Sequence, residues 1–173
     1  MSQFPIDALL EQICSAVRPG ETVLLQAPPG AGKTTRVPLA LIGALTEGQG
    51  VLEDHQKIWM IEPRRLATKA AAARLAASLG EDIGARIGYA VRGEQKRSGR
   101  TQVEVITDGL FLRRLQSDPS LDGVGCVIFD EFHERGRDAD LSLALLREAR
   151  PLLSPDLAMI LICLLYTSDA ADD

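Results

Sequence analysis

One stretch of this chain combines glycines, a lysine and two threonines in a pattern able to bind phosphate. It reads APPGAGKTT at residues 27–35 and follows a short apolar run. Glycines in such a loop let backbone N–H groups turn toward phosphate oxygens at the start of a helix. The lysine can reach the β- and γ-phosphates of a nucleotide, and the first threonine hydroxyl can bind Mg²⁺. We expect this loop to bind a nucleoside triphosphate through Pro29, Gly30, Ala31, Gly32, Lys33, Thr34 and Thr35.

The loop departs from the usual phosphate-binding pattern at one position. Ala27 stands where the first glycine of that pattern would be. An ordinary Gly/Pro turn between a strand and a helix is the other interpretation of this segment.

Two adjacent carboxylates follow a second apolar run. Residues 126–129, CVIF, lead directly into the tetrad DEFH at 130–133. The carboxyl end of a buried strand is where α/β proteins bind ligands, whereas a lone acidic pair after a strand is more often a solvated loop. Beside a phosphate loop, Asp130 is expected to bind Mg²⁺, together with Thr34, and Glu131 to accept the proton of an attacking water. These two acids and Lys33 form the candidate catalytic set.

The elements that must position these residues alternate between short apolar runs and amphipathic stretches. That rhythm is typical of an α/β domain with a mostly parallel sheet flanked by helices. The pattern predicts strands at 22–26, 57–61, 87–92, 101–107, 126–129 and 157–162. Helices are predicted over 6–17, about 33–45, 64–79, 108–116 and 138–150, with a polar loop at 46–56 and a turn at 93–100.

Composition narrows the class of protein. The chain has 173 residues, 46% hydrophobic and 25% charged, which suits one globular domain. Three cysteines without a CxxC spacing exclude a disulfide scaffold and a zinc ribbon and favour a reducing, cytoplasmic location. No signal peptide or membrane-spanning run is expected. The formal net charge of −5 includes three aspartates in the last five residues, so nucleic acid would need a local basic patch.

Further motifs extend the pattern beyond the loop and the acidic tetrad. The chain carries EPRRLA at 62–67, GYAVR at 88–92, TDG at 107–109 and IFDEFHER at 128–135. With these motifs, residues 4–162 resemble the DEAH-box helicases of superfamily 2, and within them the HrpB-type helicases. The tetrad differs from DEAH at Phe132, as it does in HrpB-type sequences. The resemblance implies a RecA-like P-loop NTPase domain that uses ATP and Mg²⁺.

The resemblance also assigns a nucleic-acid interface and a coupling residue. Arg64 and Arg65, together with Thr107, Asp108 and Gly109, would bind the backbone of single-stranded nucleic acid, with RNA expected rather than DNA. Contacts to phosphates are indifferent to base sequence, which suits a motor that steps along a strand. A solvated helix start is the other interpretation of the arginine pair. His133 would couple hydrolysis to movement.

The end of the chain breaks the resemblance. In the family, the strand at 157–162 leads to a Ser-Ala-Thr motif, whereas residues 163–173 here resemble the translation of a sequencing adapter. We therefore expect a native domain over 1–162 and a non-native tail over 163–173. A second RecA-like domain, which carries an arginine finger for the transition state, would belong to a longer protein. The present chain alone is not expected to unwind nucleic acid.

Two other functions are compatible with parts of the pattern. A P-loop small-molecule kinase or another phosphotransferase would use the same phosphate loop. A non-catalytic RNA-binding module would use the basic and TDG motifs without turnover.

Overall fold

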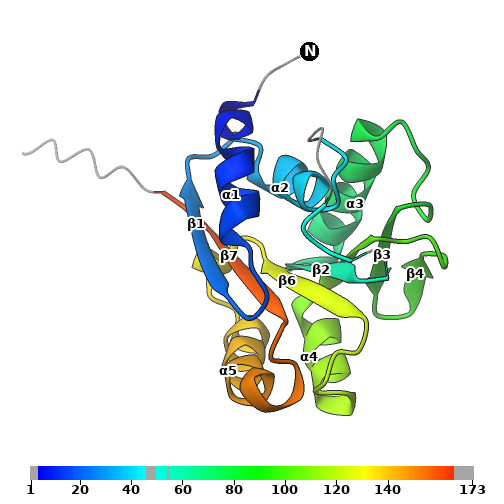
Figure 1. Ribbon diagram of the computed structural model, residues 1–173. Coiled ribbons are helices and arrows are strands. Elements are labelled where there is room, and N and C mark those ends of the chain that lie inside the picture. The colour runs from blue at the N-terminus through cyan, green and yellow to red at the C-terminus, as the bar shows by residue number, and fades with distance from the viewer. Residues whose placement is uncertain (1–3, 46–49, 54, 166–173) are drawn as a thin grey trace, which may run out of the picture.

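The computed structural model describes residues 4–45, 50–53 and 55–165. These residues form a seven-stranded sheet in the order β1-β7-β6-β2-β5-β3-β4 (Figure 1). Neighbouring strands are parallel, except for the antiparallel β3–β4 hairpin at one edge. The predicted α/β class with a mostly parallel sheet is confirmed. The strands are β1 Thr22–Ala27, β2 Lys57–Glu62, β3 Ile87–Val91, β4 Glu94–Lys96, β5 Val103–Thr107, β6 Val124–Phe129 and β7 Ala158–Leu164.

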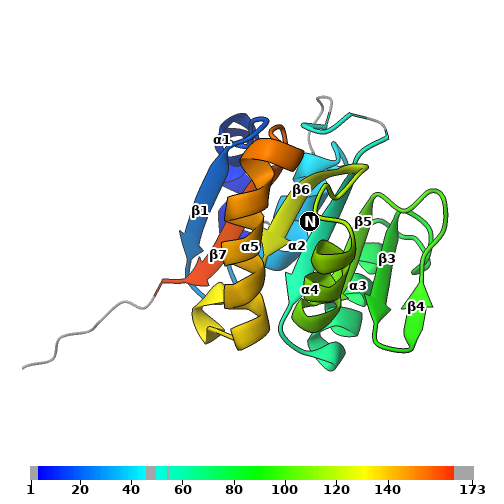
Figure 2. The same cartoon turned by 90° about the horizontal axis from the view of Figure 1, so that it is seen from below.

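Helices cover both faces of this sheet. On one face lie α1 Leu10–Ala16, α2 Lys33–Leu41 and α3 Arg65–Ser78, and on the other lie α4 Asp108–Ser117 and α5 Arg137–Leu153 (Figures 1 and 2). Two short 3₁₀ helices, η1 Pro5–Leu9 and η2 Phe132–Glu134, precede α1 and follow β6. Of the described helices, none is long and apolar enough to cross a membrane.

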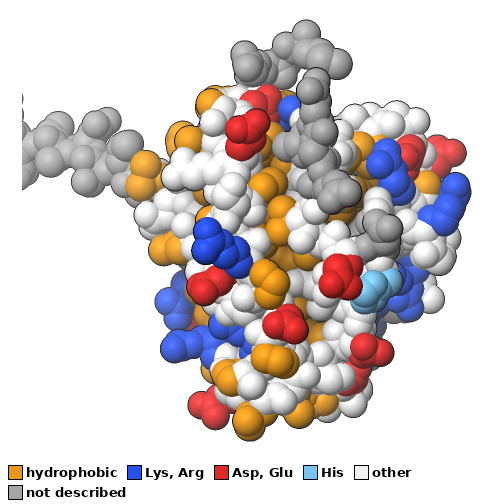
Figure 3. All heavy atoms as spheres, in the orientation of Figure 1, with side chains coloured by type: hydrophobic (Ala, Val, Ile, Leu, Met, Phe, Trp, Pro, Cys, Tyr) orange, Lys and Arg blue, Asp and Glu red, His pale blue; other side chains and the backbone are white. Residues whose placement is uncertain are grey.

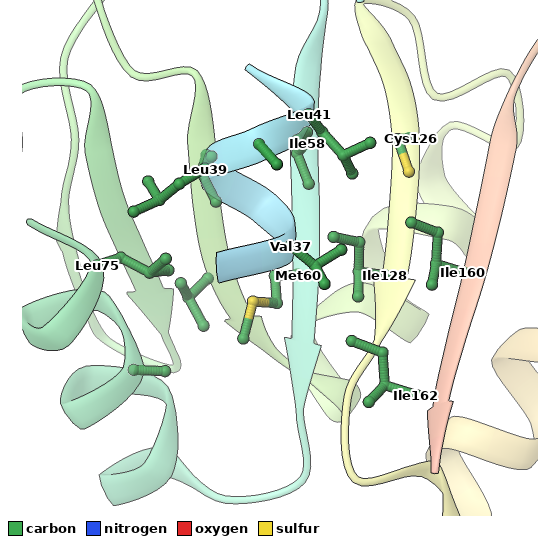
Figure 4. Packing of buried hydrophobic residues seen from close by; sticks show 14 of the residues in the cluster. Val37, Leu39, Leu41, Ile58, Met60, Leu75, Cys126, Ile128, Ile160 and Ile162 are labelled. Carbon is green, nitrogen blue, oxygen red and sulfur yellow. The ribbon is translucent and has the colours of Figure 1, made fainter. Parts of the chain in front are cut away.

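The sheet separates two apolar cores because successive side chains of a strand point to opposite faces. On β2, Ile58 and Met60 pack into the core under α1, α2 and α3, whereas Ile61 packs into the core under α4 and α5. Figure 4 shows the first of these cores, where Val37 of α2 lies over Met60 and Ile128. The central strands are therefore buried on both sides, as parallel strands usually are.

Several boundaries differ from the sequence prediction. The helix predicted to reach about residue 45 ends at Leu41, and Gly43 then adopts a φ of +74° that ends the helical turn. The predicted turn at 93–100 contains the short strand β4. The last strand runs two residues further than predicted, so Cys163 and Leu164 pair with β1. Of the remaining predicted non-native tail, Leu165 is described and residues 166–173 lie outside the described residues.

The face of the molecule shown in Figure 3 has no single dominant charge. In the space-filling view, basic, acidic and apolar side chains are interspersed over the face turned to the viewer (Figure 3). A nucleic-acid interface must therefore be sought in local clusters of basic residues.

Candidate active site

The phosphate loop connects β1 to α2 in the predicted arrangement. Gly30 and Gly32 have φ values of +74° and +91°, a region in which a side chain is strained. Gly32 is the N-cap of α2, so the loop amides lie at a helix N-terminus. A cavity of about 420 Å³ is lined by six of the seven predicted loop residues and by Glu131. The seventh, Ala31, is buried behind them.

Lys33 is buried within its own loop. Only 6% of this residue is exposed, and its ammonium group donates hydrogen bonds of 3.0 Å to the carbonyls of Ala27 and Pro28. These two acceptors hold the charge at the floor of the cavity. An incoming phosphate would be a stronger, charged acceptor for the same donors.

The two predicted metal ligands meet at the carboxyl edge of the sheet. The Thr34 hydroxyl donates a hydrogen bond of 2.6 Å to Oδ2 of Asp130, although 96 residues separate them in the chain. Asp130 is 5% exposed, and its Oδ1 accepts the N–H of Glu131 at 2.9 Å. In the described residues there is no group of three His, Cys, Asp or Glu able to hold a metal. One hydroxyl and one carboxylate nevertheless fit Mg²⁺, which keeps several waters and binds substrate phosphates.

Glu131 is held at the rim of the cavity. Its φ of +50° is a strained value for a glutamate, and such strain is common at functional sites. Its carboxylate lies 3.2 Å from Nε2 of His133. Burial and then the charge of Asp130 raise the pKa of Glu131.

His133 joins the acidic tetrad to the end of β7. Its Nδ1 accepts a hydrogen bond of 3.3 Å from the N–H of Leu164. Because Nδ1 is the acceptor, a neutral ring carries its proton on Nε2, which faces Glu131. The predicted coupling residue thus contacts the candidate base, and its second contact is to the backbone of a residue in the predicted non-native tail.

The sequence reasoning missed two ionisable residues at this site. Glu62 is 3% exposed at the end of β2, and burial, then the adjacent Asp130, raises its pKa to about 9. This direction favours the neutral form of Glu62, which shares a hydrogen bond with Asp130. Arg74 of α3 lines the phosphate cavity. The sequence pattern that could have indicated Glu62 is an acidic residue at the end of a mostly apolar strand.

Four of the five predicted nucleic-acid residues share a second cavity. This cavity of about 380 Å³ is lined by Arg65, Thr107, Asp108 and Gly109, and also by two further arginines. Of those arginines, Arg92 directly follows β3 and Arg113 belongs to α4. Thr107 is the N-cap of α4, so the helix N-terminus and the guanidinium groups provide an environment for phosphate.

Arg64 lies outside that cavity. Its guanidinium group donates to the carboxylate of Glu134 at 2.9 Å, on η2 directly after the acidic tetrad. Its side chain is 72% exposed, so water weakens this ion pair. The predicted arginine pair is thus divided: Arg65 faces the second cavity, and Arg64 faces the loop that carries Glu131.

Comparisons with known proteins agree with this geometry. Residues 8–160 match the family model described as DEAD/DEAH box helicase. The chain is 41% identical to the ATP-dependent RNA helicase HrpB of Escherichia coli (strain K12), covering 98% of this chain and 20% of that protein. It is 34% identical to the DExH-box ATP-dependent RNA helicase DExH1 of Arabidopsis thaliana, covering 96% of this chain and 16% of that protein.

Solved structures give the same result for the fold. The crystal structure of the E. coli DExH-box NTPase HrpB superposes with a TM-score of 0.87 at 41% identity, over 98% of this chain and 20% of that one. The RecA-like fold expected from the sequence is confirmed. The chain spans about a fifth of the length of this relative. It belongs to the DEAD/DEAH box helicase family.

Proposed function

We propose that this chain is the ATP-binding and ATP-hydrolysing first motor domain of a cytoplasmic helicase that acts on RNA rather than DNA. The observation that carries this proposal is the 2.6 Å hydrogen bond between Thr34 and Asp130. It joins the phosphate loop to the acidic tetrad, so the residues proposed to bind phosphate and to activate water lie beside one another. The relatives named above as ATP-dependent RNA helicases support the choice of RNA.

The residues of the chain divide the work of hydrolysis. The loop amides and the Lys33 ammonium group would bind the β- and γ-phosphates. Thr34 and Asp130 would hold Mg²⁺, which when bound neutralises charge on those phosphates. Glu131 would take a proton from the attacking water, with His133 fixing its orientation. The side chain of Arg74 offers a planar cation at the cavity wall, on which a purine base could stack.

The second cavity would hold the nucleic-acid backbone. Arg65 and the N-terminus of α4 at Thr107, Asp108 and Gly109 can bind consecutive phosphates without reading bases. Arg64 would join them by exchanging the carboxylate of Glu134 for a phosphate. Since Glu134 follows the tetrad, this exchange would connect nucleic-acid binding to the hydrolytic loop.

The complete activity requires more than this chain. We propose a native domain over residues 1–162, with a second RecA-like domain supplied by a longer protein. The arginine finger of such a domain is typically worth about 10³–10⁵ in turnover. The 173-residue chain should bind nucleotide and hydrolyse it slowly, if at all, and should not unwind a duplex.

Nucleotide binding by this chain is the first test. Titration with a fluorescent ATP analogue and Mg²⁺ should saturate, and Lys33→Ala should abolish tight binding because it removes the buried cation. Equal affinity of wild type and variant would remove the phosphate loop from the mechanism. In the longer protein, a small-molecule kinase would form a phosphorylated acceptor without stimulation by RNA. A plain RNA-binding module would bind RNA regardless of ATP and of Lys33→Ala.

A further inference from the structure

The N-terminal segment, residues 4–7, lies directly against the phosphate loop. The N–H of Ile6 donates a hydrogen bond of 3.1 Å to the carbonyl of Ala31, in the middle of that loop. Both residues are almost fully buried, with exposed fractions of 2% and 3%. Water therefore cannot replace this hydrogen bond, and its loss would leave a buried backbone group unpaired. This contact fixes the backbone of the loop from behind.

Phe4 packs against the glycine that begins α2. A Cβ placed on Gly32 would lie 2.9 Å from both Cβ and Cγ of Phe4, so the ring occupies the space beside the glycine backbone. Phe4 also lines the phosphate cavity. Gly32 has a φ of +91°, a backbone conformation that can turn successive N–H groups toward an anion. The ring of Phe4 thus restricts the backbone conformations available to Gly32, because glycine has no side chain of its own to restrict them.

An ion pair locks this segment to the first turn of α2. Nε of Arg36 lies 2.6 Å from Oδ1 of Asp7, and these side chains are only 23% and 13% exposed. The other carboxylate oxygen of Asp7 accepts the backbone N–H of Phe4 at 3.0 Å. The Arg36 guanidinium group lies over the Phe4 ring, 5.7 Å from its centre. One carboxylate therefore connects the segment, the ring and the helix that follows the loop.

We propose that residues 4–7 are a brace that holds the phosphate loop in its ligand-binding conformation, and that Phe4, Asp7 and Arg36 are positioning residues for nucleotide phosphates. The proposal rests on the proposed function, since it assumes that the loop binds a nucleotide. A loop held in its bound conformation loses less conformational freedom when the ligand arrives. Ile6 and Asp7 contact the loop and the first turn of α2, so their effect on nucleotide passes through the loop amides.

A matched pair of variants tests the brace on the 173-residue chain. Asp7→Ala removes the link to Arg36, and Glu81→Ala removes an ion pair with Arg86 that has the same 2.6 Å distance but lies outside both cavities. In titrations with a fluorescent ADP analogue, Asp7→Ala should weaken binding about 5- to 10-fold, the effect of a lost preorganising contact. Glu81→Ala should stay within about twofold, as expected for a more exposed pair. The thermal midpoints without nucleotide measure the purely structural cost of each change.

Two further variants separate the brace from general destabilisation. Arg36→Ala added to Asp7→Ala should cause little further loss of affinity, because both changes remove the same link. Phe4→Ala should weaken binding, whereas Phe4→Leu, which retains an apolar side chain beside Gly32, should restore most of it.

Hydrogen exchange without nucleotide gives a readout that does not depend on the proposed function. Amides of residues 30–34 should exchange faster in Asp7→Ala than in wild type or in Glu81→Ala. Provided that wild type binds the ADP analogue, the brace would be overturned if Asp7→Ala bound it with the affinity of wild type. It would also be overturned if the loop amides of Asp7→Ala exchanged at the wild-type rate. If wild type and Lys33→Ala failed alike to bind nucleotide, the proposed function would fail, and exchange alone would decide the brace.

Discussion

Glu62 should make the stability of this domain fall as pH rises. The side chain is 3% exposed beside Asp130, and its pKa is raised from 4.5 to about 9, chiefly by burial. The folded state thus holds a proton that the unfolded chain releases at much lower pH. An acid whose pKa is higher in the folded state stabilises the fold fully at pH values below its unfolded-state pKa. This contribution to stability is lost as the pH rises through its folded-state pKa. Glu62→Gln removes that dependence while keeping a neutral hydrogen-bond donor toward Asp130.

The magnitude follows from the two pKa values. Between them, each pH unit lowers the free energy of unfolding by about 1.4 kcal/mol, because folding takes up one proton. Relative to Glu62→Gln, wild type should therefore lose about 3 kcal/mol between about pH 5 and about pH 7. That is a large fraction of the stability of an ordinary domain.

Urea denaturation of wild type and Glu62→Gln at several pH values measures this difference. The two free energies of unfolding should be similar near pH 5 and diverge steadily toward pH 8, with the variant the more stable. Glu148→Gln, an exposed carboxylate on α5, serves as the control and should follow wild type. Parallel curves for wild type and Glu62→Gln would show that Glu62 does not retain a proton in the folded state.

Three more predictions concern the base, the tetrad and a tight turn. A general base must be ionised and the pKa of Glu131 is raised, so the steady-state ATPase rate of the longer protein should rise with pH through that pKa. Glu131→Gln should keep ATP binding but stop turnover. Undiminished hydrolysis by this variant would refute the assignment of Glu131 as the base. Phe132→Ala should cost about 1–2 kcal/mol in urea denaturation, against about 3–5 kcal/mol for the fully buried Phe111; equal losses would contradict the packing. Gly20→Ala and Gly80→Ala both place a side chain at positive φ, but only the new Cβ at residue 20 would meet a backbone carbonyl oxygen, that of Pro155 at 2.6 Å. The thermal midpoint of Gly20→Ala should therefore fall further than that of Gly80→Ala. Equal shifts would count against the clash.

Local patterns were sufficient to predict the phosphate loop and the strands on either side of the acidic tetrad. APPGAGKTT carries its own glycines and helix start, so no distant contact is needed to recognise it. The helix opened by Asp138 and closed by Arg150 was predicted from charges that suit the helix dipole, and α5 spans these residues. The ends of helices and strands were predicted less accurately. The turn at Gly43 ends α2 earlier than predicted, and the segment predicted as a plain turn at 93–100 forms β4 of the β3–β4 hairpin.

The environment of Glu62 could not be predicted in the same way. Its raised pKa depends on β2 lying next to β6, a pairing between strands more than 60 residues apart. The same holds for Arg64, whose partner Glu134 lies 70 residues away. Sequence motifs predicted which residues belong to the candidate site, whereas the sheet order determines which of them lie close enough to share a hydrogen bond or an ion pair.

The chain of aromatic rings under α4 gives the domain a built-in optical probe. Trp59, the single tryptophan, packs edge-on against Phe111, which packs against Phe129, and that ring in turn against Phe132. Intrinsic tryptophan fluorescence therefore reports on this half of the molecule, while circular dichroism reports on helices from both faces of the sheet. Coincident unfolding curves from the two signals would mean that the two cores melt as one cooperative unit. Separate curves would mean that the half beneath the acidic tetrad can loosen independently of the half that supports the phosphate loop.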